Sequence, residues 1–181
     1  ADNTSQGGSK TGKLETQYDP TGNLTRLQVK RNGTCLPAGA DCSQVFAYTW
    51  DEVGRLTRAR RWDVATLPAI TGPLPTDATD AELAYAYDAG DQRVLKTAGD
   101  QHTVYVFESL ELRRATFSAG DYELSKWTET GFLFAHGVRL ARVVWDQPDV
   151  PTIGGAETHV FLEIGDHLGS TSVVLDKATG E

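Results

Sequence analysis

A short pattern that occurs twice constrains the fold more than any other feature of this 181-residue chain. YDPTGNLTRL starts at Tyr18 and WDEVGRLTRA starts at Trp50, and both read aromatic-Asp-x-x-Gly-x-Leu-Thr-Arg. A weaker copy, YDAGDQRVLK, starts at Tyr87 and carries Asp91 in place of the glycine. A catalytic motif usually occurs once, whereas repetition at constant internal spacing is typical of architecture.

Each copy has the residues that a β-hairpin turn requires. The aromatic ring is expected to end one strand and to pack on the sheet. The aspartate opens the turn because its carboxylate accepts backbone N–H groups. The residue four after the aromatic needs a positive φ, which suits glycine and is tolerated by aspartate. These turn residues are Asp19 and Gly22, Asp51 and Gly54, and Asp88 and Asp91.

The remaining pattern also favours strands. Apolar residues alternate with period two, as in the run that places Phe46, Tyr48 and Trp50 on one face. Clusters such as KRNGT and SAGDY separate these runs and indicate turns. TDAE (residues 79–82) matches a helix capping box, but the aromatics after it alternate, so a strand is expected there. We predict an all-β fold, in which antiparallel hairpins form one continuous sheet strip.

Three regions follow from the order of these patterns. Residues 1–13 are expected to be a flexible lead-in, 14–98 the hairpin repeats, and 99–181 a further β-rich segment. The Pro-rich stretch 65–80 is expected to be a long surface loop inserted between two repeats. Cys35 and Cys42 lie in a second insertion, where they either form a local disulfide or remain free thiols. A bridge would indicate an oxidising compartment.

The composition excludes several classes of partner. A net charge of −8 argues against nucleic acid or an anionic membrane as the main partner. No apolar run approaches the roughly 20 residues of a membrane-spanning helix. The polar N-terminus has no signal-peptide core, and the chain contains no methionine, so we expect a fragment or a processed chain.

No candidate site in the sequence points to an enzyme or to a cofactor. The histidines lack the spacing of metal ligands and are expected to be structural; they are His102, His136, His159 and His167. Asp166 and His167, with serines nearby, suggest a hydrolase, but adjacent strand residues point to opposite faces. We therefore interpret Asp166 and Gly169 as turn residues. The repeated aspartates could form a ladder of calcium ligands, although separate turn capping is the favoured interpretation.

The three repeats resemble the YD repeats of Rhs-family proteins, which are related to bacterial Tc-toxin shell components and to animal teneurins. The C-terminal DHLGSTSVVLDKATGE, which contains Asp166, His167 and Gly169, resembles the start of the closing segment of the Rhs core. The resemblance covers residues 14–181. It implies a structural role, in which YD hairpins form the wall of a hollow shell around a C-terminal toxin polypeptide. It also implies a secreted or cell-surface location in a bacterium, as part of a larger protein.

The resemblance further implies the partners: other parts of the same shell, or another Rhs chain paired at a β-edge, and the toxin cargo. The chain also departs from the family pattern. The copies start at 18, 50 and 87, so their spacings of 32 and 37 residues exceed the roughly 20 residues of tight hairpin repeats. Three copies are too few to close a shell, and the self-cleavage segment of the family is missing, so no autoproteolysis is assigned.

An alternative function is a surface recognition module that binds glycan or protein. Three tryptophans motivate it, since exposed indole rings stack on sugar rings; they are Trp62, Trp127 and Trp145. The competing interpretation is that these rings pack inside the sheet. A remnant of a protease or glycosidase is a third and weaker possibility.

Overall fold

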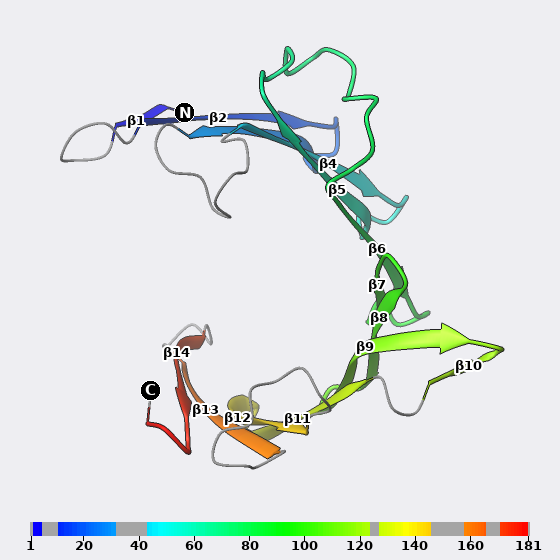
Figure 1. The fold of residues 1–181 in the computed structure, drawn as a ribbon, viewed down its shortest axis with the longest axis vertical. Coiled ribbons are helices and arrows are strands. Elements are labelled where there is room, and N and C mark those ends of the chain that lie inside the picture. Colours follow the sequence, from blue (N-terminus) through cyan, green and yellow to red (C-terminus); the bar gives the residue numbers. More distant parts are fainter. Residues whose placement is uncertain are drawn as a thin grey trace. The chain divides into compact units, whose positions relative to one another are not determined.

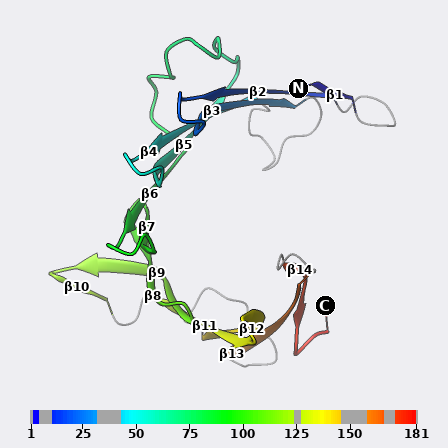
Figure 2. The same cartoon turned by 180° about the vertical axis from the view of Figure 1, so that it is seen from behind.

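The computed structural model describes residues 2–4, 11–31, 43–123, 127–145, 158–165 and 171–180. These residues form antiparallel strands and no helix, which confirms the all-β hairpin architecture (Figures 1 and 2). Within the described part of the chain, no helix is present that could cross a membrane. The chain divides into two compact units, 1–85 and 86–181, and each is described by itself. The boundary expected between residues 98 and 99 stays a prediction.

In the first unit, consecutive strands are neighbours in the sheet, and each runs antiparallel to the next. Its sheet follows the order of the chain because strands adjacent in sequence pair with each other, and the connections that the structure describes are the turns 19–23 and 51–55 and the long loop 65–80. The strands are β1 (Asp2–Thr4), β2 (Thr11–Tyr18), β3 (Leu24–Arg31), β4 (Ser43–Trp50), β5 (Leu56–Val64) and β6 (Ala81–Tyr87), the last two residues of β6 belonging to the second unit. The helix capping signal before β6 is therefore overridden by the period-two pattern.

The second unit continues in the same style, with one exception to chain order. The strand β9 pairs with β8 on one side and with β11 on the other, while the two-residue β10 folds back onto the end of β9. The strands are β7 (Arg93–Ala98), β8 (Gln101–Phe107), β9 (Leu110–Ser118), β10 (Asp121–Tyr122), β11 (Thr128–Ala135), β12 (Val138–Trp145), β13 (Thr158–Gly165) and β14 (Thr171–Asp176).

The core of the first unit lies on one face of its sheet. Val45 and Ala47 alternate along β4 with the half-buried aromatics of the opposite face, and with Trp62 of β5 they form the buried cluster. Val45 and Trp62 are direct cross-strand neighbours, which brings their side chains together. The buried face is therefore the one opposite to Phe46 and Tyr48.

The Pro-rich loop 65–80 connects β5 to β6 (Figure 1). It also packs against the buried cluster. It has no regular secondary structure, as expected, yet its Leu67 and Leu74 pack against the buried cluster. The Arg26 guanidinium donates to the carbonyl of Gly72 at 2.7 Å, and Trp62 Nε1 donates to the carbonyl of Asp77 at 3.1 Å. Since a single-layer sheet cannot bury a face by itself, this loop supplies the missing second layer.

Candidate functional site

The turn between β2 and β3 shows how the repeated pattern folds. The Asp19 N–H donates to the carbonyl of Asn23 at 2.9 Å, and the Asp19 carbonyl accepts the N–H of Gly22 at 3.1 Å. The carboxylate of Asp19 closes the turn from inside, because its Oδ1 accepts the N–H groups of Thr21 at 3.0 Å and Asn23 at 2.8 Å. Asp19 is therefore a turn residue whose carboxylate satisfies the backbone donors that the turn leaves unpaired.

The other two turns repeat these bonds with different residues. The Asp51 N–H donates to the carbonyl of Arg55 at 2.9 Å, and the Asp51 carbonyl accepts the N–H of Gly54 at 3.1 Å. Its Oδ1 accepts the N–H groups of Val53 and Arg55 at 3.1 and 2.8 Å. Likewise, the Asp88 N–H donates to the carbonyl of Gln92 at 2.9 Å, and the Asp88 carbonyl accepts the N–H of Asp91 at 3.2 Å. Its Oδ1 accepts the N–H groups of Gly90 and Gln92 at 2.8 and 2.9 Å. Each aspartate thus caps its own turn, which favours separate capping over a shared calcium ladder.

The fourth residue of each turn has the positive φ that the sequence pattern requires. The value is 91° at Gly22, 87° at Gly54 and 63° at Asp91. Only glycine enters this region without steric cost, and aspartate is among the few other residues that tolerate it. The weak third copy therefore keeps the turn although it has lost the glycine.

We expect Gly22→Ala to lower the free energy of unfolding by about 1–2 kcal/mol, the cost of a left-handed backbone with a Cβ. Beyond Gly22 and its two chain neighbours, no atom lies within 4 Å of the position that this Cβ would take, so the loss measures backbone strain. Urea denaturation followed by circular dichroism gives the value. Gly90→Ala is the matched control, because Gly90 lies in a repeated turn but outside the left-handed region. Equal losses in the two variants would contradict the assignment.

The threonine of the Leu-Thr-Arg run has a role that the sequence did not reveal. The strand register shifts opposite Tyr18 and again opposite Trp50, which leaves Thr25 and Thr57 as the extra residues of two β-bulges. The Thr25 hydroxyl donates to the carbonyl of Gln17 at 3.1 Å, and the Thr57 hydroxyl donates to the carbonyl of Thr49 at 3.0 Å. The only sequence signal was the recurrence of threonine itself.

The aromatic residue of the second copy links two successive hairpins. Trp50 Nε1 donates to the carbonyl of Leu24 at 2.8 Å, so the second turn is fastened to the return strand of the first hairpin. Tyr18, the equivalent residue of the first copy, is 58% exposed and does not pack as expected. The reason is its position, because β1 pairs only with residues 11–13 and leaves the Tyr18 end of β2 without a described strand beside it.

Hydrogen bonds lower the pKa of two of these turn carboxylates. For Asp19 the hydroxyl of Thr21, which donates at 2.7 Å, is the main cause of the lowered pKa. For Asp51 the N–H of Arg55 is the main cause, and the Arg55 guanidinium, which donates at 2.7 Å, lowers the pKa further. Bonds that favour the charged form of a carboxyl stabilise the turn as long as the group is ionised.

Acidification is therefore expected to weaken the second turn. Since the pKa of Asp51 is lower in the folded state, its contribution is fully present above the unfolded pKa of about 3.9 and is lost as the pH falls through the folded value. The Asp51→Asn variant should be less stable than the wild type at pH 7, and the difference should shrink towards pH 2. Urea midpoints measured across this range test the prediction. A difference that stays constant with pH would contradict it.

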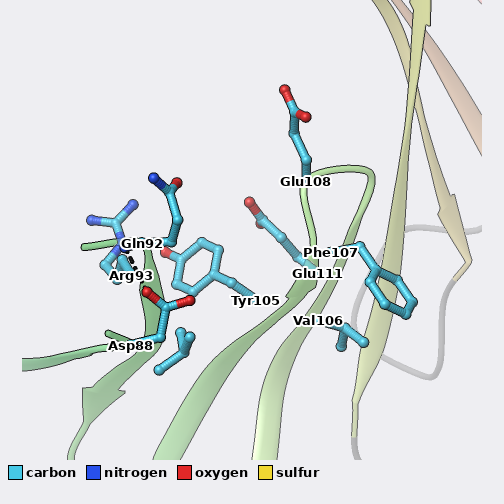
Figure 3. Close-up of a pocket in the computed structure, with 9 residues that line it drawn as sticks. Asp88, Gln92, Arg93, Tyr105, Val106, Phe107, Glu108 and Glu111 are labelled. Carbon is cyan, nitrogen blue, oxygen red and sulfur yellow. Dashed lines mark hydrogen bonds between the residues drawn. The ribbon is translucent and has the colours of Figure 1, made fainter. Parts of the chain in front are cut away.

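Two open depressions adjoin the repeated turns. One, of about 630 Å³, lies between the first two turns and is lined by Asp19, Thr21, Asn23, Thr25, Tyr48, Thr49, Trp50, Asp51, Glu52, Val53 and Gly54. The other, of about 640 Å³, lies beside the third turn (Figure 3). There the Arg93 guanidinium lies 4.7 Å from the ring centre of Tyr105, and Glu111 forms a 2.9 Å ion pair with Arg113. The carboxylates of the lining aspartates accept hydrogen bonds within their own turns. We therefore interpret both depressions as spaces left between neighbouring strands and turns.

The histidines that the structure describes lie apart from one another in structural settings. His102 Nδ1 lies 3.1 Å from the hydroxyl of Tyr122, and His136 is a turn residue with a φ of 50°. His159 is buried, with Nδ1 3.8 Å from the carboxylate of Asp176. No group of three His, Cys, Asp or Glu side chains that could hold a metal occurs among the described residues.

Several candidate residues lie outside the described part of the chain. They are Cys35, Cys42, Asp166, His167 and Gly169. The possible disulfide and the interpretation of the DHLGS stretch as a turn therefore stay predictions.

The comparisons with known proteins leave the family open. No family profile matches the sequence, and neither does any curated protein. The chain is similar to a solved structure titled "Crystal Structure of TcdB2-TccC3", with 16% sequence identity and a TM-score of 0.48. The alignment covers 95% of this chain and 10% of that chain, so this chain spans about a tenth of that protein's length.

Proposed function

We propose that this chain is a wall segment of an Rhs or YD-repeat shell, which encloses or presents a C-terminal toxin polypeptide. One observation carries the proposal: three turns of different sequence, at Asp19, Asp51 and Asp88, are built by the same backbone and carboxylate bonds. Such repetition is how a sheet wall is extended hairpin by hairpin. The parent protein would be secreted by a bacterium or displayed on its surface.

The proposal includes a structural rather than a catalytic role for the repeated side chains. The carboxylate of each aspartate holds its own turn, and each bulge threonine bonds a carbonyl of the facing strand. A group committed to such a bond is a poor general base or nucleophile, because catalysis would break the bond that positions it. We therefore expect the isolated chain to show no protease or glycosidase activity.

The proposed partners are the neighbouring parts of the shell. The strand β14 pairs with β13 along one side, and among the described residues no strand pairs with its other side. An unpaired strand edge offers backbone donors and acceptors to another strand. We propose that the next part of the same wall, or another chain of the same type, pairs there, and that the enclosed toxin is the second partner.

The coding sequence on both sides of this segment tests the proposal most directly. We expect further aromatic-Asp-x-x-Gly repeats before or after it and a variable domain at the C-terminal end of the parent protein. Expressed whole, the parent should protect that domain from an added protease, and a parent with the wall repeats deleted should not. Flanks without repeats and without a C-terminal domain would rule out a toxin shell.

Carbohydrate recognition is a second candidate because one of the tryptophans is exposed. Trp145 is 56% exposed, with Glu129 and Thr158 as its cross-strand neighbours, while Trp127 Nε1 lies 3.4 Å from Glu129 Oε1. An indole flanked by polar groups suits a sugar ring. Trp62 does not contribute, since it is buried. A glycan array should give binding that Trp145→Ala abolishes and Leu133→Ala retains; a blank array would remove this candidate.

A further inference from the structure

One face of the sheet formed by β11, β12, β13 and β14 is apolar across all four strands. Leu133, Ala141, Leu162 and Leu175 lie directly opposite one another in the register, so their side chains share this face. Residues two positions along each strand share it too. The complete set, called the apolar face below, is Leu133, Ala141, Val143, Trp145, Val160, Leu162, Ile164, Val173 and Leu175.

The apolar face is largely open to solvent. Leu133, Leu162, Ile164 and Val173 are exposed to 56, 44, 52 and 46%, and Trp145 lies at the margin. With side chains of this size, the exposed part of the face amounts to roughly 600 Å², the upper end of what monomeric proteins show. It approaches the roughly 800 Å² that each partner contributes to a standard protein interface.

The opposite face of the same four strands is closed by its own long side chains. The guanidinium of Arg139 lies 5.0 Å from the ring centre of Phe132, and that of Arg142 lies 5.0 Å from the ring centre of Phe161. Both arginines form ion pairs with Glu163, whose side chain is 2% exposed. The two arginines cover the rings of Phe132 and Phe161 and pair with Glu163, while Phe134 on the same face is 41% exposed. The apolar face, which has no such side chains over it, is therefore the less covered of the two.

We infer that the apolar face docks against the same face of a second copy of this chain. An apolar sheet face is complementary to another such face, and two of them pack about 10 Å apart as the layers of a sandwich. A two-fold axis between identical faces covers both at once and closes the contact after two chains. The centre of the face carries no charge that an ionic ligand would recognise, and its area is close to that of a stable interface.

The inference is independent of the proposed shell. It concerns a sheet face, whereas the wall would extend through strand edges, so either can fail without the other.

Neighbouring valines of β14 provide a matched test. Val173 lies opposite Ile164 on the apolar face, whereas Val174 lies opposite Glu163 on the closed face, and they are similarly exposed at 46 and 39%. In sedimentation velocity, the wild type and Val174→Lys should have a mass near twice the 19.7 kDa of one chain. Val173→Lys should sediment as a monomer, with dimerisation weakened at least a hundredfold, because its ammonium would be buried without a partner.

The same experiment contains the outcomes that overturn the inference. A wild-type chain that stays monomeric up to about 100 μM has no interface of the size described. A dimer that survives both substitutions is held elsewhere, for example at a strand edge. Circular dichroism shows whether each variant folds, and Ile164→Lys replaces Val173→Lys if the latter does not. Acrylamide quenching gives a second measurement, since dimerisation should protect Trp145 in the wild type and leave Val173→Lys unprotected.

Discussion

Trp62→Ala is expected to lower the free energy of unfolding of the first unit by about 3–5 kcal/mol, the range for removing a large ring from a core. Trp62 is 3% exposed and packs with Val45 and Ala47. Its Nε1 also holds the covering loop through the carbonyl of Asp77, which would lose its donor. Unfolding in urea, followed by circular dichroism, measures the loss.

The same substitution should release the loop as well. Trp62 belongs to the cluster on which residues 65–80 pack, and it bonds the carbonyl of Asp77 in that loop. We therefore expect Trp62→Ala to be cleaved in this segment by a low concentration of protease that spares the wild type. Trp145→Ala is the matched control, since it removes an equal ring that is 56% exposed. At a concentration low enough to keep the chain monomeric, it should cost less than about 1 kcal/mol. Similar losses in both variants would mean that the loop does not cover a core.

Turn chemistry made the repeated hairpins predictable from the sequence. The need for a carboxylate at Asp19 and for a left-handed backbone at Gly22 is decided within five consecutive residues, so no knowledge of the rest of the fold is required. The same local logic extends to Asp91, where aspartate replaces glycine without loss of the turn. Strand type was equally accessible, because alternation with period two is a property of each segment alone.

Contacts between distant segments could not be predicted in this way. The bond from Arg26 to Gly72 spans 46 residues, and nothing in the local sequence of either indicates the other. The loop 65–80 was expected at the surface because proline and threonine exclude a regular element, but its leucines, Leu67 and Leu74, carried the missing information. Leucines spaced along an irregular loop indicate that the loop covers a core.

In the candidate site, too, local features could be predicted from the sequence, and features that depend on strand pairing could not. Asp19, Asp51 and Asp88 were identified from the pattern, whereas the bulge role of Thr25 and Thr57 depends on a register shift that only the paired strands define. The apolar face was hidden for a related reason. Period two marks two faces on every strand, but which one is covered depends on long side chains such as those of Arg139 and Arg142.

Glu163→Gln is expected to destabilise the second unit by about 2–3 kcal/mol, because it leaves two arginines without the carboxylate that pairs them. The substitution keeps the volume of the side chain, so the loss reports charge and not a cavity. The carboxylate is almost fully buried, whereas the side chains of Arg139 and Arg142 are 42 and 31% exposed. These guanidinium groups can regain water, which holds the cost below that of stranding two buried charges.

A surface ion pair provides the control for this prediction. Arg58 and Glu82 approach to 2.8 Å, but their side chains are 51 and 37% exposed, so Glu82→Gln should cost less than about 1 kcal/mol. A double-mutant cycle of Glu163→Gln with Arg139→Ala should give a coupling energy above about 1 kcal/mol, since the two groups share one network. A coupling near zero would show that Glu163 is held by burial alone. The closed face would then owe its cover to the aromatic contacts of the arginines, and the contrast between the two faces of β11–β14 would rest on packing rather than on charge.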